Sequence, residues 1–67
     1  MVGDVDVRAL RNRLGLSREQ FAQRFRFPAR TVREWEQGRR RPDQSARAYL
    51  TVIDRNPKAV EDALSAP

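Results

Sequence analysis

The sequence predicts an all-α fold, a single domain over residues 1–67 built from five short helices. Apolar residues recur three and four positions apart, as on one face of a helix. No segment alternates apolar and polar residues as a half-buried strand does. Glycines, prolines and capping residues separate the periodic segments. The five expected helices cover about residues 5–14, 17–25, 28–37, 43–55 and 57–66.

The first helix is expected to follow a frayed start at residues 1–4. Val7, Leu10 and Leu14 recur at the i, i+3, i+7 spacing of one helical face. Asp4 and Asp6 fit the N-terminus, where a carboxylate meets the positive end of the helix dipole. Gly15 fits a left-handed C-terminal cap.

The second helix begins at Ser17, because Ser17 and Gln20 have the spacing of a capping box. Phe21, Ala22 and Phe25 form its buried face. The small side chain of Ala22 allows the next helix to cross closely.

A turn at Arg26 and Phe27 leads into the third helix. Pro28 suits the first position of that helix, and Gly38 suits its C-terminal cap.

The third helix has one apolar and one polar face. Val32 and Trp35 point inward, and this spacing favours a core role for Trp35 over stacking on a nucleic-acid base. The opposite face, at about 100° per residue, carries Arg30, Arg33, Glu34 and Gln37.

Two further helices follow a basic loop at Arg39–Arg41. Asp43 fits the N-cap of the fourth helix and Asn56 that of the fifth, with Pro57 at its first turn. The apolar positions are Ala46, Leu50 and Ile53 in the fourth helix, and Val60 and Leu64 in the fifth.

The net charge of +5 is unevenly distributed. The segment from Arg8 to Arg47 holds twelve arginines and four acidic residues, a net charge of +8, whereas the remaining residues carry −3. Arginine is the better bidentate ligand for phosphate and guanine. A basic surface confined to one segment indicates a polyanionic partner rather than a merely solvated face.

Composition also excludes several classes of site. The chain has no cysteine and no histidine, so we expect no disulfide, no metal and no cofactor. No apolar run is long enough to span a bilayer and no signal-peptide pattern is present, so a cytoplasmic protein is expected. We do not expect an enzyme, because Ser17 is used as a cap and Glu34 and Glu36 point in different directions from one helix.

Joint motifs resemble the phage-repressor-like (Cro/C1, XRE) helix-turn-helix family over about residues 5–55. The motifs are Leu14-Gly15-Leu16-Ser17, Phe21-Ala22, Thr31-Val32, Trp35-Glu36, Gly38 and Pro42. The resemblance implies a compact five-helix lambda-repressor-like domain. The runs Trp35–Pro42 and Tyr49–Pro57 look closest to the antitoxin branch of HigA- and MqsA-like proteins.

The resemblance implies that the third helix reads a palindromic operator in double-stranded DNA, with the protein bound as a homodimer. The base-reading positions fall on Ala29, Arg30, Arg33 and Glu34. The phosphate-contacting positions fall on Arg18, Gln37, Arg39, Arg40 and Arg41. An arginine would bind guanine O6 and N7, Ala29 would touch a thymine methyl group, and Glu34 would accept from cytosine N4 or orient Arg30.

The resemblance also implies a partly buried ion pair between Arg11 and Glu36, whose loss through Glu36→Ala would cost about 3–5 kcal/mol. Two residues depart from the family pattern. Arg26 stands where glycine is common, at a cost of about 1 kcal/mol if its φ is positive. Pro28 replaces the usual serine or threonine cap, so the register of base contacts is open by about one residue.

Tyr49, Val52, Val60 and Leu64 remain as apolar positions that one small core need not bury. They favour a two-fold dimer contact built from the last two helices. The alternative is that the fifth helix packs onto the first and fourth within one chain.

These observations predict a sequence-specific transcriptional repressor, in its most specific form an antitoxin that regulates its own operon and binds a cognate toxin. No separate toxin-binding segment fits in the chain, so the toxin binds the folded domain or the chain is part of a longer protein.

The alternative is a helix-turn-helix module that binds a protein partner without sequence-specific DNA binding. RNA stays open as a ligand of the basic face, although an A-form major groove does not admit a helix. A homeodomain-like third helix is excluded, because Gly38 falls where that family reads adenine with asparagine.

Overall fold

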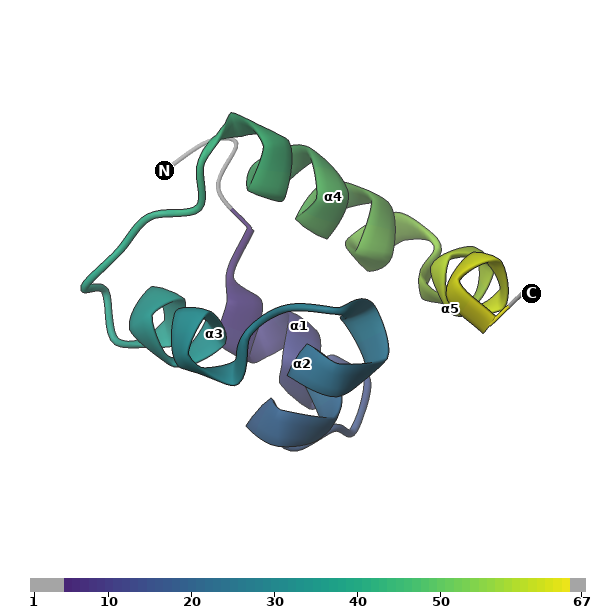
Figure 1. The fold of residues 1–67 in the computed structure, drawn as a ribbon, viewed down its shortest axis with the longest axis horizontal. Coiled ribbons are helices and arrows are strands. Elements are labelled where there is room, and N and C mark those ends of the chain that lie inside the picture. Colours follow the sequence, from purple (N-terminus) through teal and green to yellow (C-terminus); the bar gives the residue numbers. More distant parts are fainter. Residues whose placement is uncertain (1–4, 66–67) are drawn as a thin grey trace.

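The computed structural model describes residues 5–65, which form five helices and no strand (Figure 1). The helices are α1 (Val7–Arg13), α2 (Arg18–Phe25), α3 (Ala29–Glu36), α4 (Gln44–Arg55) and α5 (Pro57–Ser65). The predicted all-α fold is confirmed, and the observed bounds of every helix lie within two residues of those expected. The predicted frayed start at residues 1–4 and the last residue of the predicted fifth helix lie outside the described residues.

Side-chain caps fix where α1, α2, α4 and α5 begin. Ser17 Oγ accepts a hydrogen bond from the Gln20 N–H at 3.1 Å, and Gln20 Oε1 accepts one from the Ser17 N–H at 2.9 Å. This is the predicted capping box. The same role, a side-chain oxygen accepting from the N–H three residues on, is filled by Asp6, Asp43 and Asn56. Each such cap stabilises its helix by about 1 kcal/mol.

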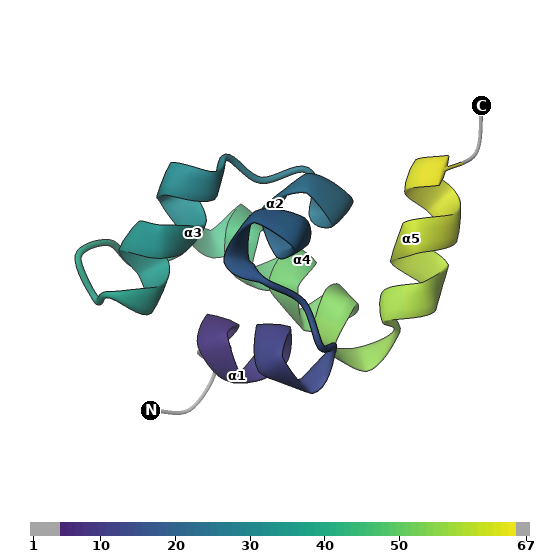
Figure 2. The ribbon, with the colours of Figure 1, turned by 90° about the horizontal axis from the view of Figure 1, so that it is seen from below.

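The helices pack around one apolar core. α2 packs against α3 and α5, α1 packs against α3, and α4 packs against α5 (Figures 1 and 2). The largest fully buried side chains come from α1 to α4 and are Leu10, Phe21, Phe25, Val32, Leu50 and Ile53. Every predicted apolar face therefore contributes to the same core.

The turn between α2 and α3 has a left-handed residue that is not glycine. Arg26 has φ 67° and ψ 40°, and the Phe27 N–H donates to the Ala22 carbonyl at 2.8 Å. This closes α2 with the backbone pattern usually made by a C-terminal glycine. Pro28 is the N-cap of α3 and not its first residue as predicted, and it makes no side-chain cap bond.

An aromatic cluster holds this turn against the core. The ring of Phe27 lies 5.9 Å from that of Phe21, 5.1 Å from that of Trp35 and 5.2 Å from that of Tyr49. The Tyr49 hydroxyl donates to the Phe25 carbonyl at 2.8 Å. This carbonyl lies in the last turn of α2, where no helical N–H is available to it. The first turn of α3 is therefore positioned from α2 and α4 together.

We expect Arg26→Gly to stabilise the protein by about 1 kcal/mol, because glycine adopts positive φ without the steric cost that a side chain carries. The change also removes an exposed hydrogen bond from Arg26 Nη2 to the Leu64 carbonyl, 3.3 Å long, whose loss offsets a small part of the gain. Urea unfolding followed by circular dichroism measures the difference. A less stable Arg26→Gly protein would show that the contact to Leu64 outweighs the backbone cost.

Candidate nucleic-acid interface

The outer face of α3 is the side of this helix that points away from the core. Arg30 has 85% of its side chain exposed, and Arg33 and Gln37 are exposed on the same face. Glu34 lies at the edge of this face with 27% of its side chain exposed. Ala29, the remaining predicted base-reading residue, is partly buried and packs against the core. Ala29 therefore already has apolar contacts within the chain.

Glu34 joins α3 to the loop that follows it. Its Oε2 lies 3.6 Å from Arg30 Nε, which is the i, i+4 pair expected from the sequence. Its Oε1 accepts a hydrogen bond from Arg40 Nη1 at 3.3 Å. This second contact was not predicted, because the path of the loop is not encoded in a helical spacing.

The loop between α3 and α4 returns along the end of α3. Gly38 has φ 74°, and the Arg39 N–H donates to the Glu34 carbonyl at 3.0 Å. Glycine takes this left-handed conformation at no steric cost. The side chains of Arg39, Arg40 and Arg41 are exposed next to the outer face of α3. The predicted basic loop thus adjoins the predicted recognition surface.

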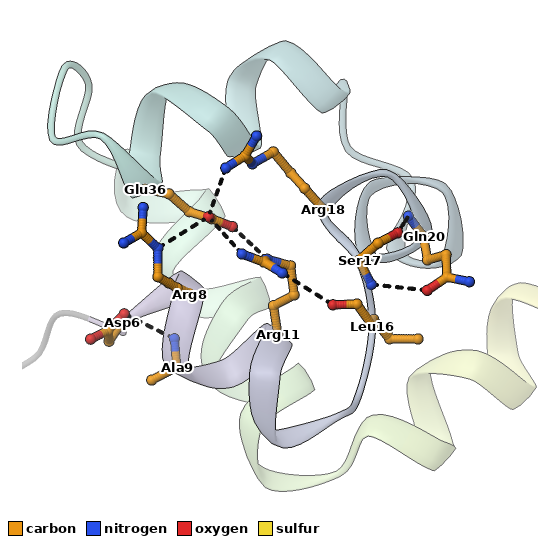
Figure 3. A network of polar contacts seen from close by, with 9 residues as sticks. All are labelled: Asp6, Arg8, Ala9, Arg11, Leu16, Ser17, Arg18, Gln20 and Glu36. Atoms are coloured by element: carbon orange, nitrogen blue, oxygen red, sulfur yellow. Dashed lines mark hydrogen bonds and ion pairs between the residues drawn. The ribbon is translucent and has the colours of Figure 1, made fainter.

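Glu36 is the acidic centre of a second cluster, whose side chains converge from α1, α2 and α3 (Figure 3). Its carboxylate is fully covered. Arg11 donates to it through Nε at 2.8 Å and Nη2 at 3.0 Å, and also donates to the Leu16 carbonyl at 3.2 Å. Arg8 and Arg18 each approach Glu36 Oε1 at 3.5 Å. The predicted Arg11–Glu36 pair is present, within a larger cluster.

Charge pairing shifts the titration of both main partners. The hydrogen bonds from Arg11 hold the pKa of Glu36 below its ordinary value, although burial opposes this shift. The same hydrogen bonds raise the pKa of Arg11. The pair therefore stays ionised at neutral pH, and three guanidinium groups around one carboxylate leave a positive surplus.

Arg18, predicted to contact phosphate, lies at the start of α2 and faces this cluster. Its side chain is 29% exposed, and its buried Nε has no hydrogen-bond partner among residues 5–65. Part of the guanidinium group remains available to solvent beside the N-terminus of α2. Arg8 was missed at the sequence level, although its position three residues before Arg11 places both on one face of α1.

Three of the four residues predicted for a dimer contact have partners within the chain. Val60 is 8% exposed and belongs to the core, and Leu64 packs against that core. Tyr49 contacts Phe27 and donates to the Phe25 carbonyl. Only Val52, which is 51% exposed, is a large exposed apolar residue within the described chain. α5 folds onto α2 and α4, which accounts for the burial of Val60 and is close to the predicted intrachain alternative.

Residues 6–64 match the family model of a helix-turn-helix domain. The chain is also 44% identical to a solved structure from Agrobacterium tumefaciens, described as an HTH XRE-family like protein. The two superpose with a TM-score of 0.86 over 88% of this chain and 95% of that one. The chain belongs to the XRE-like helix-turn-helix family. No curated protein matches it.

Membership of the XRE-like family indicates a DNA-binding transcription regulator, because this fold is that of such regulators. The exposed face of α3 is therefore the candidate DNA-binding surface. In a helix-turn-helix unit the second helix enters the major groove. α3 is the second helix of the unit formed by α2, the turn and α3. Within residues 5–65 no helix has the length and apolar character needed to cross a membrane.

We expect Glu36→Ala to lower the free energy of unfolding by about 3 kcal/mol, the low end of the range for breaking a buried ion pair. The low end applies because Arg11 is 14% exposed and Arg8 is 56% exposed, so water reaches the stranded guanidinium groups. Urea unfolding measures the loss. The control is Asp62→Ala, whose exposed pair with Lys58 contributes less than about 1 kcal/mol. Equal losses in the two variants would contradict a structural role for Glu36.

We expect the contribution of Glu36 to disappear in acid. Its folded-state pKa lies below the ordinary value of 4.5, so the unfolded chain takes up a proton at a pH where the folded protein does not. The stabilisation is complete well above pH 4.5 and is lost as pH falls through the folded pKa. Unfolding of wild type and Glu36→Gln should be compared between about pH 7 and pH 3. The difference in free energy of unfolding between the two proteins should become smaller toward low pH. A constant difference would contradict the lowered pKa of Glu36.

Proposed function

We propose that this protein is a sequence-specific repressor that binds double-stranded DNA through α3. The observation that carries this proposal is the outer face of α3, where Arg30, Arg33 and Gln37 are exposed next to the loop Arg39–Arg41. A bidentate arginine contact to guanine is the commonest specific contact in a major groove. Loop arginines flanking the groove supply the phosphate contacts that set register and affinity.

The start of α2 offers a second contact to the DNA backbone. Arg18 is partly exposed there, and the surplus charge of the Glu36 cluster lies beside the same helix N-terminus. A helix N-terminus also attracts anions through its free N–H groups. This site and the loop Arg39–Arg41 would hold the DNA backbone while α3 reads the bases between them.

The finer proposal is that two copies occupy the half-sites of a palindrome, about 34 Å apart. Val52 on α4 is the exposed apolar residue that supports a contact between copies. The most specific form of the proposed function is an antitoxin that represses its own operon. The antitoxin-like runs Trp35–Pro42 and Tyr49–Pro57 support this form. In that form the selected operator should occur upstream of the gene that encodes this chain.

The test is selection of bound duplexes from a random pool, followed by sequencing. We expect an enriched palindrome whose half-site contains guanine, with affinity falling about 10³–10⁵-fold from 50 to 200 mM salt for 6–10 phosphate contacts. Arg33→Ala should lose about 1–3 kcal/mol of discrimination at one base pair.

The matched control is Arg55→Ala, which removes the same charge from an exposed position near the end of α4. It should change affinity slightly and leave the preferred sequence unchanged. An enriched site without two-fold symmetry would contradict the dimer on a palindrome. No enriched sequence, or a shallow salt dependence, would contradict the repressor and favour a module that binds a protein partner.

A further inference from the structure

We propose that Glu34 determines specificity by restraining two arginines, one on α3 and one on the following loop, until the correct bases are met. This inference rests on the proposed DNA-binding function and deepens it. Glu34 would weaken binding to arbitrary DNA more than it weakens binding to the operator.

The geometry places Glu34 between two different kinds of DNA contact. Each carboxylate oxygen serves one guanidinium group, Oε2 that of Arg30 at 3.6 Å and Oε1 that of Arg40 at 3.3 Å. Arg30 lies on the base-reading face of α3, whereas Arg40 lies in the loop that would contact phosphate. A single side chain thus connects base recognition with backbone contact.

The backbone keeps this arrangement in place. The Arg39 N–H donates to the Glu34 carbonyl at 3.0 Å, and Gly38 in its left-handed conformation turns the chain back along α3. The loop therefore brings Arg40 back to the side chain of Glu34, whose carbonyl accepts the Arg39 N–H at the end of the helix. The Glu34 side chain is 27% exposed, while the side chains of Arg30 and Arg40 are 85% and 62% exposed.

Glu34 is the acidic residue of α3 whose side chain is partly exposed to solvent. The other one, Glu36, is fully covered and surrounded by arginines. Removing the charge of Glu34 would therefore leave Arg30 and Arg40 without their shared carboxylate and make the outer face more positive. Affinity for arbitrary DNA depends chiefly on the number of phosphates that such cations neutralise.

The restraint has a different effect at the operator. A phosphate that recruits Arg40 must compete with Glu34, and the carboxylate is repelled by nearby phosphates on any sequence. At the correct bases, Glu34 accepts a hydrogen bond from a cytosine amino group while Arg30 binds guanine. Both side chains then exchange their mutual ion pair for contacts with the bases. Specificity is a difference between affinities, and an unfavourable group acting on the wrong sequence increases that difference.

The experiment compares Glu34→Gln with Asp62→Asn, which removes one negative charge from a pair of similar kind. Asp62 lies 3.5 Å from Lys58 on α5 and is 68% exposed. Dissociation constants should be measured at several salt concentrations for the selected operator and for a scrambled duplex of equal length and composition. Thermal melting checks that both variants are folded.

We expect Glu34→Gln to bind the scrambled duplex about 10-fold more tightly and to steepen its salt dependence by about one phosphate equivalent. The ratio of operator to scrambled affinity should fall at least ~10-fold, as for loss of one base-pair contact. Asp62→Asn should leave this ratio within about 2-fold of wild type, because Asp62 lies on α5, outside the proposed interface, and salt screens exposed charges.

A second comparison identifies the released cation. The gain of Glu34→Gln on the scrambled duplex should shrink when Arg40→Ala is also present and persist when Arg39→Ala is present, because coupled residues give non-additive effects. An unchanged affinity ratio, an equal gain on both duplexes, or full additivity with Arg40→Ala would overturn the inference alone. Wild-type protein that does not distinguish the duplexes would instead refute the proposed function, and the inference with it.

Discussion

The placement of α3 depends on the covered carboxylate of Glu36. A buried carboxylate is tolerated only with close cationic partners and hydrogen bonds. Those partners come from α1 and from the start of α2, so one side chain at the C-terminal end of α3 connects three helices. Satisfying this charge therefore dictates where the last turn of α3 lies. The apolar contacts of Val32, which is completely buried, hold the middle of the helix.

The other end of α3 is fixed by aromatic packing. Phe27 lies in the turn that leads into α3 and contacts rings from α2, α3 and α4. Edge-to-face and offset ring pairs have preferred geometries, so they orient the turn as well as bury it. The phenol of Tyr49 adds a direction-dependent hydrogen bond to the end of α2. α3 is thus held by charge at its end and by rings at its beginning, with one side left to solvent.

Local patterns predicted the helices well because capping and apolar spacing act over three or four residues. The predicted N-cap residues cap their helices, and the predicted apolar faces pack into the core except at Ala46, which is only partly buried and lies outside the core cluster. The Arg11–Glu36 pair came from the family resemblance, since residues this far apart share no local pattern. The contact of Arg40 with Glu34 required the path of a loop. The roles of Tyr49 and Val60 were not evident for a related reason, because an apolar position in a sequence does not say whether its partner lies in the same chain. Pro28 was predicted to be the first residue of α3 but is its N-cap. Proline suits both positions, so the sequence did not distinguish them.

The separation of core-facing and exposed residues on α3 has a consequence for the evolution of such a protein. The residues that secure the helix point toward the core or toward the arginines of α1 and α2, whereas Arg30, Arg33 and Gln37 take no part in the core. Substitutions at exposed helical positions of this kind usually alter stability by less than about 0.5 kcal/mol. The surface that would choose among DNA sequences is therefore free to vary while the scaffold is retained, and duplicated copies of such a gene can acquire new targets without first becoming less stable.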